Sequence, residues 1–348
     1  MSNLSITPCL TTGIGSLPVK DAADACKIVF DSVDIPFWPQ LPRRSFKEFM
    51  MPQYAEGIPF LKTDEEKERI WFEIGDDKAD KIYAFYEKYL KENPYDFALS
   101  KEYAPGFYFF IDELERQKRR FEYLKGHVTG PLTFSLSISD QNKRPIYYDT
   151  DMLDVIVKAI SQKAVWQVKE LQKYADKAVI FIDEPILSAF GSSTYLGLTR
   201  EDVIRLLNEV IDAVQKAGAV SGIHCCGNTD WSIIASTKID IINFDAYLFT
   251  KSIAIYPNEI SVFLKRGGFL AWGIVPTSEA VRKESADSLF NKMTNDMKQL
   301  ITTNAFSKEL LLKQCLITPS CGTGSMQEAD ARAVFRTLKE LGKKFKEV

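Results

Sequence analysis

Histidine is almost absent from this sequence. Among its 348 residues, His127 and His224 are the only two. A metal centre with three histidine ligands is therefore excluded for a single chain. The same scarcity excludes any mechanism that needs several imidazole side chains.

Long apolar runs and an excess of charge are also missing. No stretch approaches the roughly 20 apolar residues that cross a bilayer, and the N-terminus lacks the basic start and apolar run of a signal peptide. The chain has 44 lysines and arginines against 47 acidic residues, a formal net charge of −3. Such a balance offers no electrostatic surface to nucleic acid or to an anionic membrane. We therefore expect a cytoplasmic protein with neither nucleic-acid nor membrane partners.

Cysteine occurs at six positions, and the expected compartment decides how they are interpreted. A cytoplasmic protein keeps its thiols reduced, so a disulfide framework is not expected. Metal binding and burial remain as roles for these side chains. The six are Cys9, Cys26, Cys225, Cys226, Cys315 and Cys321.

The chain alternates short apolar runs with long amphipathic segments, without an internal repeat or a linker rich in glycine and serine. This alternation is typical of a parallel α/β architecture. Eight strands are expected, which is the number that a closed (β/α)8 barrel needs. We therefore expect a single (β/α)8 TIM-barrel domain over residues 1–348. The expected strands are Thr11–Leu17, Phe107–Ile111, Gly126–Thr129, Ala178–Ile182, Ala219–His224, Asp240–Phe244, Gly268–Ile274 and Cys315–Thr318.

Two helix starts and one insertion complete the expected organisation. Thr199 to Asp202 forms a capping box, and Gly218 stands where a glycine ends the same helix. The residues from Ser325 to Glu328 are expected to open the last helix in the same way. Residues 21–105 are aromatic and charged, and we expect them to form an insertion after the first strand that caps one mouth of the barrel.

Sulfur gathers where a TIM barrel places its catalytic residues, at the C-terminal ends of strands. His224 and Cys226 end one expected strand and face the same side because they are two residues apart, while Cys225 faces away. Cys321 follows another strand and is the candidate third ligand. Imidazole with thiolate is a favoured donor set for zinc, and three protein ligands leave one position open. Asp245 is the candidate for that position at rest.

A structural interpretation competes with the metal site. Free cysteine is among the most buried residue types, so a strand that ends in His-Cys-Cys can also belong to the core. The neighbouring Asp183 and Glu184 can be a solvated acidic pair, and Ser16 can cap a helix. Arg43 and Arg44 lie in an aromatic segment and are candidates for binding a carboxylate or a phosphate.

The order of short motifs resembles the catalytic domain of cobalamin-independent methionine synthase. It is also similar to that of the corrinoid-dependent coenzyme M methyltransferases and uroporphyrinogen decarboxylase. The motifs are IGSLP, TGP, IDEP, H-x-C-G and SCG, and they span nearly the whole chain. The resemblance implies a (β/α)8 barrel, zinc held by His224, Cys226 and Cys321, and methyl transfer to a thiol. It also places the zinc carboxylate of the family on Asp245, in the sequence DIINFD.

The same resemblance implies a substrate site. Ser16 of the IGS motif and Asp183 of the DEP motif would hold the amino-acid end of homocysteine, with a main-chain contact from Ile14. Glu184, beside Asp183, is a further candidate for this site. Asp183 and Asp245 are the catalytic candidates. The decarboxylase activity is disfavoured because that chemistry needs no metal.

Two departures from the methionine synthases concern the methyl donor. The expected seventh strand ends in GIVPTS, without the histidine that protonates a leaving folate, and the segment TFSLSISD lacks the tryptophan of a folate platform. A methyl-corrinoid, free or on a corrinoid protein and not tightly bound, is therefore the expected donor. The sequence thus predicts a zinc-dependent methyltransferase that converts homocysteine to methionine. The alternatives are a methylcorrinoid:coenzyme M-type methyltransferase and a non-catalytic corrinoid- or metal-binding subunit of a methyl-transfer system.

Overall fold

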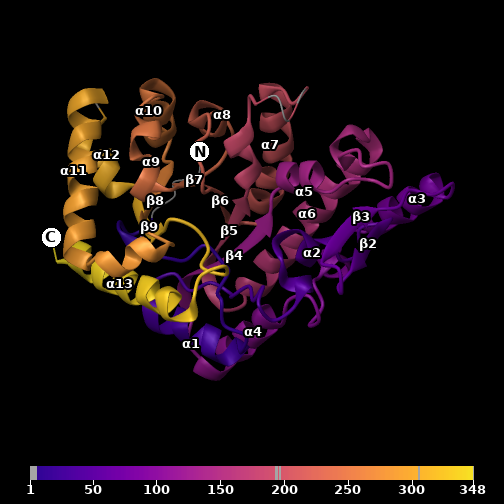
Figure 1. Ribbon diagram of the computed structural model, residues 1–348, viewed down its shortest axis with the longest axis horizontal. Helices are drawn as coiled ribbons and strands as arrows, with labels where there is room; N and C mark the ends of the chain where they lie inside the picture. Colours follow the sequence, from indigo (N-terminus) through magenta and orange to yellow (C-terminus); the bar gives the residue numbers. More distant parts are fainter. Residues whose placement is uncertain (1–5, 193–194, 196, 305, 348) are drawn as a thin grey trace.

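A curled sheet of seven parallel strands forms the centre of the molecule, and helices surround it (Figure 1). The computed structural model describes residues 6–192, 195, 197–304 and 306–347. Across the sheet the strand order is β1-β9-β8-β7-β6-β5-β4. The strands are β1 (Leu10–Thr11), β4 (Phe121–Thr129), β5 (Ala175–Asp183), β6 (Val220–Cys225), β7 (Ile241–Phe244), β8 (Phe269–Val275) and β9 (Cys315–Pro319).

The helices follow the strands and cover the outside of the sheet, as a parallel topology requires. The sheet buries long apolar runs on both faces; all seven residues of β8, for example, are buried. The helices are α1 (Ala22–Ser32), α4 (Pro105–Gln117), α5 (Pro131–Ser137), α6 (Thr150–Leu171), α7 (Arg200–Lys216), α8 (Trp231–Ala235), α9 (Ala246–Ile253), α10 (Pro257–Lys265), α11 (Ala286–Asn304), α12 (Lys308–Lys313) and α13 (Glu328–Lys346). None of the described helices is long and apolar enough to cross a membrane.

Six of the eight expected strands are confirmed. The first, expected at Thr11–Leu17, is largely wrong, since β1 spans Leu10–Thr11 and shares only Thr11 with that range. The strand expected at Phe107–Ile111 is wrong, because these residues lie inside α4. Pro105 stands at the start of this helix, where its missing N–H costs nothing. The buried side chains of Phe107, Phe110 and Leu114 follow at the spacing of one helical face.

The place of the missing strand is taken by an extended segment, residues 36–40, that spans the two edges of the sheet. On one side, Lys125 of β4 donates its backbone N–H to Pro36 O at 2.8 Å. On the other side, Gln40 N donates to Gly15 O at 3.1 Å and Leu17 N donates to Gln40 O at 2.9 Å. The pairing stays limited to isolated bridges, since the prolines in this segment lack N–H groups. The fold is therefore TIM-barrel-like, with seven strands in continuous pairing.

The residues that follow this segment form a projection beside the sheet, toward the right of Figure 1. It contains α2 (Met50–Ala55), the hairpin of β2 (Leu61–Asp64) and β3 (Arg69–Phe72), and α3 (Lys78–Tyr89). The start of α2 is tied to the C-terminal end of β4: Thr129 donates its hydroxyl to Met50 O at 2.6 Å, and Tyr54 donates to His127 O at 2.5 Å. Within the range 21–105, α1 and residues 36–40 lie along the sheet, and α2 lies at the strand ends.

One of the two expected helix starts is confirmed. Thr199 caps α7, with its hydroxyl accepting from Asp202 N at 3.1 Å, and Gly218 after that helix has a φ of +85°. The start expected at Ser325 is wrong, because α13 begins at Glu328 without a side-chain cap. The physical reason is a competing set of bonds: the guanidinium of Arg43 donates to the carbonyls of residues 324–326 and holds them in a loop.

Candidate metal centre

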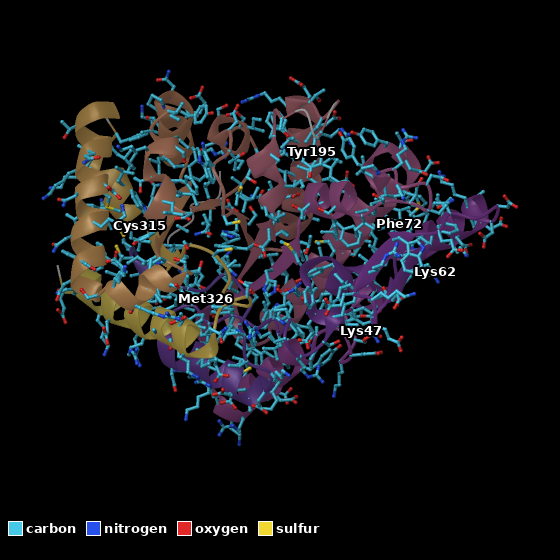
Figure 2. All side chains as sticks on the ribbon, in the orientation of Figure 1. Lys47, Lys62, Phe72, Tyr195, Cys315 and Met326 are labelled. Atoms are coloured by element: carbon cyan, nitrogen blue, oxygen red, sulfur yellow. The ribbon has the colours of Figure 1, made fainter. Side chains whose placement is uncertain are left out.

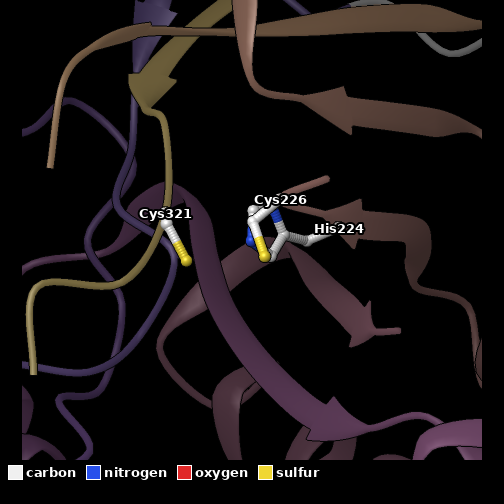
Figure 3. A group of neighbouring side chains, drawn as sticks. All are labelled: His224, Cys226 and Cys321. Carbon is white, nitrogen blue, oxygen red and sulfur yellow. The ribbon is translucent and has the colours of Figure 1, made fainter. Parts of the chain in front are cut away.

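Three side chains from two separate strand ends meet at one point, as Figure 3 shows. His224 lies in β6 and Cys226 directly follows it. Cys321 lies two residues beyond β9, at the end opposite to Cys315 (labelled in Figure 2). One ligand atom from each of the three lies within 4.8 Å of the others, and the described residues contain no second group of this kind. Cys225 is buried on the other face of the strand, with its thiol 3.7 Å from Gly227 O.

The orientation of His224 is set by a buried amide on the next strand. The register of β6 and β7 places His224 beside Asn243, and Asn243 Oδ1 contacts His224 Nδ1. Asn243 Nδ2 donates to Ala271 O at 2.9 Å and to Thr318 Oγ1 at 2.7 Å, so the amide oxygen must face the imidazole. An oxygen acceptor requires that Nδ1 carries the proton. In the neutral ring, Nε2 therefore has a free lone pair.

The ionisation of the cluster couples the imidazole to the sulfurs. Contacts with Cys321 and His224 lower the pKa of Cys226 to about 4, although burial opposes them. The contact with Cys226 and burial both raise the pKa of Cys321. Burial lowers the pKa of His224, but the Cys226 sulfur and Asp183 outweigh it and raise that pKa. Cys226 is thus the sulfur that ionises first, whereas the raised pKa values of Cys321 and His224 mean that a bound metal ion would displace protons from these two groups.

The residues fit a zinc ion. His224 Nε2 is buried and has no hydrogen-bond partner among the described residues. With Zn–S distances of about 2.3 Å and Zn–N of about 2.0 Å, ligand atoms in a tetrahedral site lie roughly 3.5–4 Å apart. The observed spread, within 4.8 Å, is closed by small side-chain shifts. One imidazole and two thiolates form a donor set that favours zinc, and they leave one position open.

A cavity of about 470 Å³ opens above the three side chains. Asp183 and His224, which are 8% and 3% exposed, form its buried floor together with the half-buried Cys226. Asp183 Oδ1 has no hydrogen-bond partner among the described residues, and burial raises the pKa of this carboxyl to about 6. The remaining lining residues are Ile14, Gly15, Ser16, Gln40, Pro42, Arg43, Phe49, Met50, Pro185, Cys321, Gly322, Gly324 and Ser325.

Ser16 and Ile14 line this cavity and also hold its walls together. The Ser16 hydroxyl accepts from Gly324 N at 3.2 Å, and its carbonyl accepts from Thr323 N and Thr323 Oγ1, both at 2.9 Å. These bonds fix the loop that carries Cys321. The carbonyl of Ile14 accepts from the buried Lys125 Nζ at 2.5 Å. Each of the two residues therefore already has a structural partner.

Glu184 and Asp245 do not line the cavity. Both carboxylate oxygens of Glu184 face α5: they accept from Leu132 N at 2.9 Å, from Thr133 N at 2.7 Å and from the Thr133 hydroxyl at 2.6 Å. Asp245 caps α9 by accepting from Leu248 N at 2.9 Å, and it lies outside the group of three potential ligands. Burial raises the pKa of Asp245 to about 6, and His224 and Cys226 both act on it electrostatically.

Sequence reasoning missed Asn243, Phe49 and Met50. Asn243 has a detectable signal, because an amide inside the apolar strand IINF needs a buried partner. Phe49 and Met50 precede and open α2, which no strand-end motif identifies. Their place at the cavity depends on the fold of the whole projection.

Comparisons with known proteins support the fold. No protein-family profile matches the sequence, and neither does any curated protein. Among solved structures, a methyltransferase from Methanosarcina mazei is similar over 97% of this chain and 94% of that one, with 12% identity and a TM-score of 0.52. A B12-independent methionine synthase from Shewanella sp. W3-18-1, in complex with selenomethionine, matches 68% of this chain and 67% of that one, with 15% identity and a TM-score of 0.45. The first likeness shows that this chain shares its fold with the Methanosarcina mazei protein.

Proposed function

We propose that this protein is a zinc-dependent methyltransferase that transfers a methyl group to the sulfur of homocysteine, with a methyl-corrinoid as donor. The observation that carries the proposal is the meeting of His224, Cys226 and Cys321 at the floor of a cavity. Because all three side chains line this cavity, the open coordination position of a bound metal ion would face the space available to the substrate. The Methanosarcina mazei protein of the same fold is a methyltransferase, which agrees with this activity.

The metal would be held by His224 Nε2 and the sulfurs of Cys226 and Cys321. When bound, zinc supplies a Lewis acid that lowers the pKa of a thiol while leaving the sulfur nucleophilic. Asn243 keeps the proton of His224 on Nδ1 and so keeps Nε2 available. Ser16 holds the loop of Cys321 in place through three hydrogen bonds.

Asp183 is the group that selects an amino-acid thiol. Its Oδ1 is buried without a partner, and a buried carboxylate oxygen of this kind needs a donor or a cation. The α-ammonium group of homocysteine supplies both. Coenzyme M carries no ammonium group, so the same oxygen disfavours it as the substrate. Asp183 thereby orients the thiol, and orientation is the main contribution that the protein makes to a methyl transfer.

Turnover with a panel of thiols tests the proposal. The zinc-loaded protein is incubated with methyl-cobalamin and, separately, with homocysteine, coenzyme M and 2-mercaptoethanol, and methyl-cobalamin consumption is followed by absorbance. We expect consumption with homocysteine and formation of methionine, and little with the other thiols. Preferred turnover of coenzyme M would assign the second substrate instead. No turnover with any thiol or with a methylated corrinoid protein would leave a non-catalytic subunit as the function.

A further inference from the structure

Two neighbouring arginines, Arg43 and Arg44, have different surroundings. Arg44 Nη1 pairs with Glu48 at 3.1 Å, so its charge is compensated. Arg43 lines the cavity above the metal centre and is exposed, whereas Asp183 and His224 are buried. Arg43 therefore lies at the open end of the cavity that has the metal centre at its floor.

Two nitrogens of the Arg43 guanidinium, Nε and Nη2, hold it in place. Nε donates to Gly324 O at 3.4 Å, and Nη2 donates to Ser325 O at 3.0 Å and Met326 O at 2.8 Å. Met326 is labelled in Figure 2, on the loop before α13. These three carbonyls fix the plane of the guanidinium without neutralising it. In the described part of the chain, no carboxylate pairs with Arg43 and no hydrogen bond engages its Nη1.

The expected charges in the cavity favour a cation at this place. Two cysteinates cancel the charge of a divalent zinc ion, and Asp183 adds a negative charge. A bound homocysteine thiolate carries a sulfur anion, an ammonium group and a carboxylate, so it adds a further net negative charge. Among the described residues that line the cavity, Arg43 is the only lysine or arginine. Lys125 acts electrostatically on Asp183, but it does not line the cavity and its Nζ donates to Ile14 O. The charge of Arg43 is therefore the one that faces the carboxylate of the substrate.

We propose that Arg43 binds the carboxylate of an amino-acid thiol through its free Nη1 group. The proposal rests on the function proposed above and extends it by naming a residue that determines substrate specificity. Three contacts then fix the substrate: its sulfur lies at the metal, its ammonium group at Asp183 and its carboxylate at Arg43. A guanidinium that is already held by three carbonyls loses little side-chain entropy when it binds a carboxylate.

Calorimetric titration of the zinc-loaded protein with two thiols tests this assignment. Homocysteine is compared with 3-aminopropane-1-thiol, which has the same chain and amine but no carboxylate. We expect the wild type to bind homocysteine about tenfold more tightly than the amine thiol, the effect of one charge-assisted contact. In Arg43→Gln this preference should disappear through weaker binding of homocysteine alone. An unchanged preference in Arg43→Gln would show that Arg43 only holds the loop, and would overturn the proposal.

Two variants separate recognition from folding and from general electrostatics. Arg44→Gln removes a neighbouring positive charge outside the cavity and should keep the wild-type preference. Arg43→Lys retains a cation that can donate to the loop carbonyls. If Arg43→Gln loses zinc, Arg43→Lys takes its place in the titration, and its preference for homocysteine over the amine thiol should be reduced. Failure of the wild type to bind either thiol would contradict the proposed function itself, and that result is distinct from equal binding of both thiols.

Discussion

Asn243 determines which nitrogen of His224 faces the cavity, because its oxygen occupies Nδ1 while its amide group is committed to Ala271 and Thr318. Replacing it in Asn243→Leu removes the acceptor, and the imidazole is then free to rotate or change tautomer. We expect zinc affinity to fall about 10- to 100-fold, as for other partners of metal-bound histidines. Competition with a chromophoric chelator measures the affinity. Thr318→Val is the matched control: it removes one partner of Asn243 but leaves the oxygen, so affinity should change little.

The identity of the sulfur ligands is tested by metal content. Cys226→Ser and Cys321→Ser should each contain much less than one zinc per chain, whereas Cys225→Ser should keep about one. The reason is the strand geometry, which turns Cys225 away from His224. Zinc is measured by elemental analysis of the purified, dialysed proteins. If Cys226→Ser and Cys321→Ser both kept full zinc while Cys225→Ser contained none, Cys225 and not Cys226 would be the zinc ligand.

Direct coordination of the substrate is a separate expectation. X-ray absorption of the zinc-loaded protein should show one additional sulfur scatterer at about 2.3 Å when homocysteine is added. Three protein ligands leave room for it, and the cavity lies on the same side. An absorption spectrum that does not change at saturating thiol would mean that the metal does not activate the thiol.

The methyl donor should be a corrinoid. Folate leaves as a poor amine anion unless a proton reaches it, and the loss of a general acid costs about 10²- to 10⁴-fold in rate. After β8 the chain continues with Pro276, Thr277 and Ser278, which carry no imidazole or carboxylate. We therefore expect transfer from methyl-cobalamin and very slow transfer from methyl-tetrahydrofolate, measured as methionine formed. Rapid, corrinoid-free turnover with the folate would point to an acid elsewhere, and Asp245 and Glu184 are the first carboxyls to replace.

Glu184 should contribute to stability more than to substrate binding. Its oxygens accept three hydrogen bonds from Leu132 and Thr133, and burial raises the pKa of Glu184 to about 7. Glu184→Ala leaves these donors buried and unpaired, so the free energy of unfolding should fall by about 3 kcal/mol or more. Glu184→Gln keeps one carbonyl acceptor and should lose less. Denaturant unfolding measures both; a stable Glu184→Gln protein with a raised KM for the thiol would indicate a substrate contact.

The central strands could be predicted because each is a buried apolar run followed by a polar turn. Phe107–Ile111 could not be separated from a strand by hydrophobicity alone, since a short apolar run fits one face of a helix equally well. Residues 36–40 were missed for another reason: the prolines in that segment argue against a strand, and its pairing consists of single bridges. Their role depends on long-range contacts with β4 and with the turn after β1.

In the site, the grouping of His224, Cys226 and Cys321 follows from strand parity and from the common end of parallel strands. The orientation of Glu184 could not be predicted in this way. Glu184 follows the last residue of β5, so its direction depends on the conformation of the loop and not on strand alternation. The tie between Arg43 and residues 324–326 joins segments that lie far apart in the chain. No local pattern marks such a partnership, and the expected cap at Ser325 was wrong for that reason.

The loop of Cys321 has a consequence for the order in which the protein matures. Two of the three potential ligands emerge from the ribosome with β6, but the third follows β9, close to 100 residues later in synthesis. The loop is then fastened to Ser16, which lies 307 residues before Thr323 in the chain. A nascent chain therefore presents only His224 and Cys226, and the group of three potential ligands forms only when the loop of Cys321 has packed against Ser16. A metal ion held by all three side chains, as proposed above, would therefore bind late and would report a completed fold.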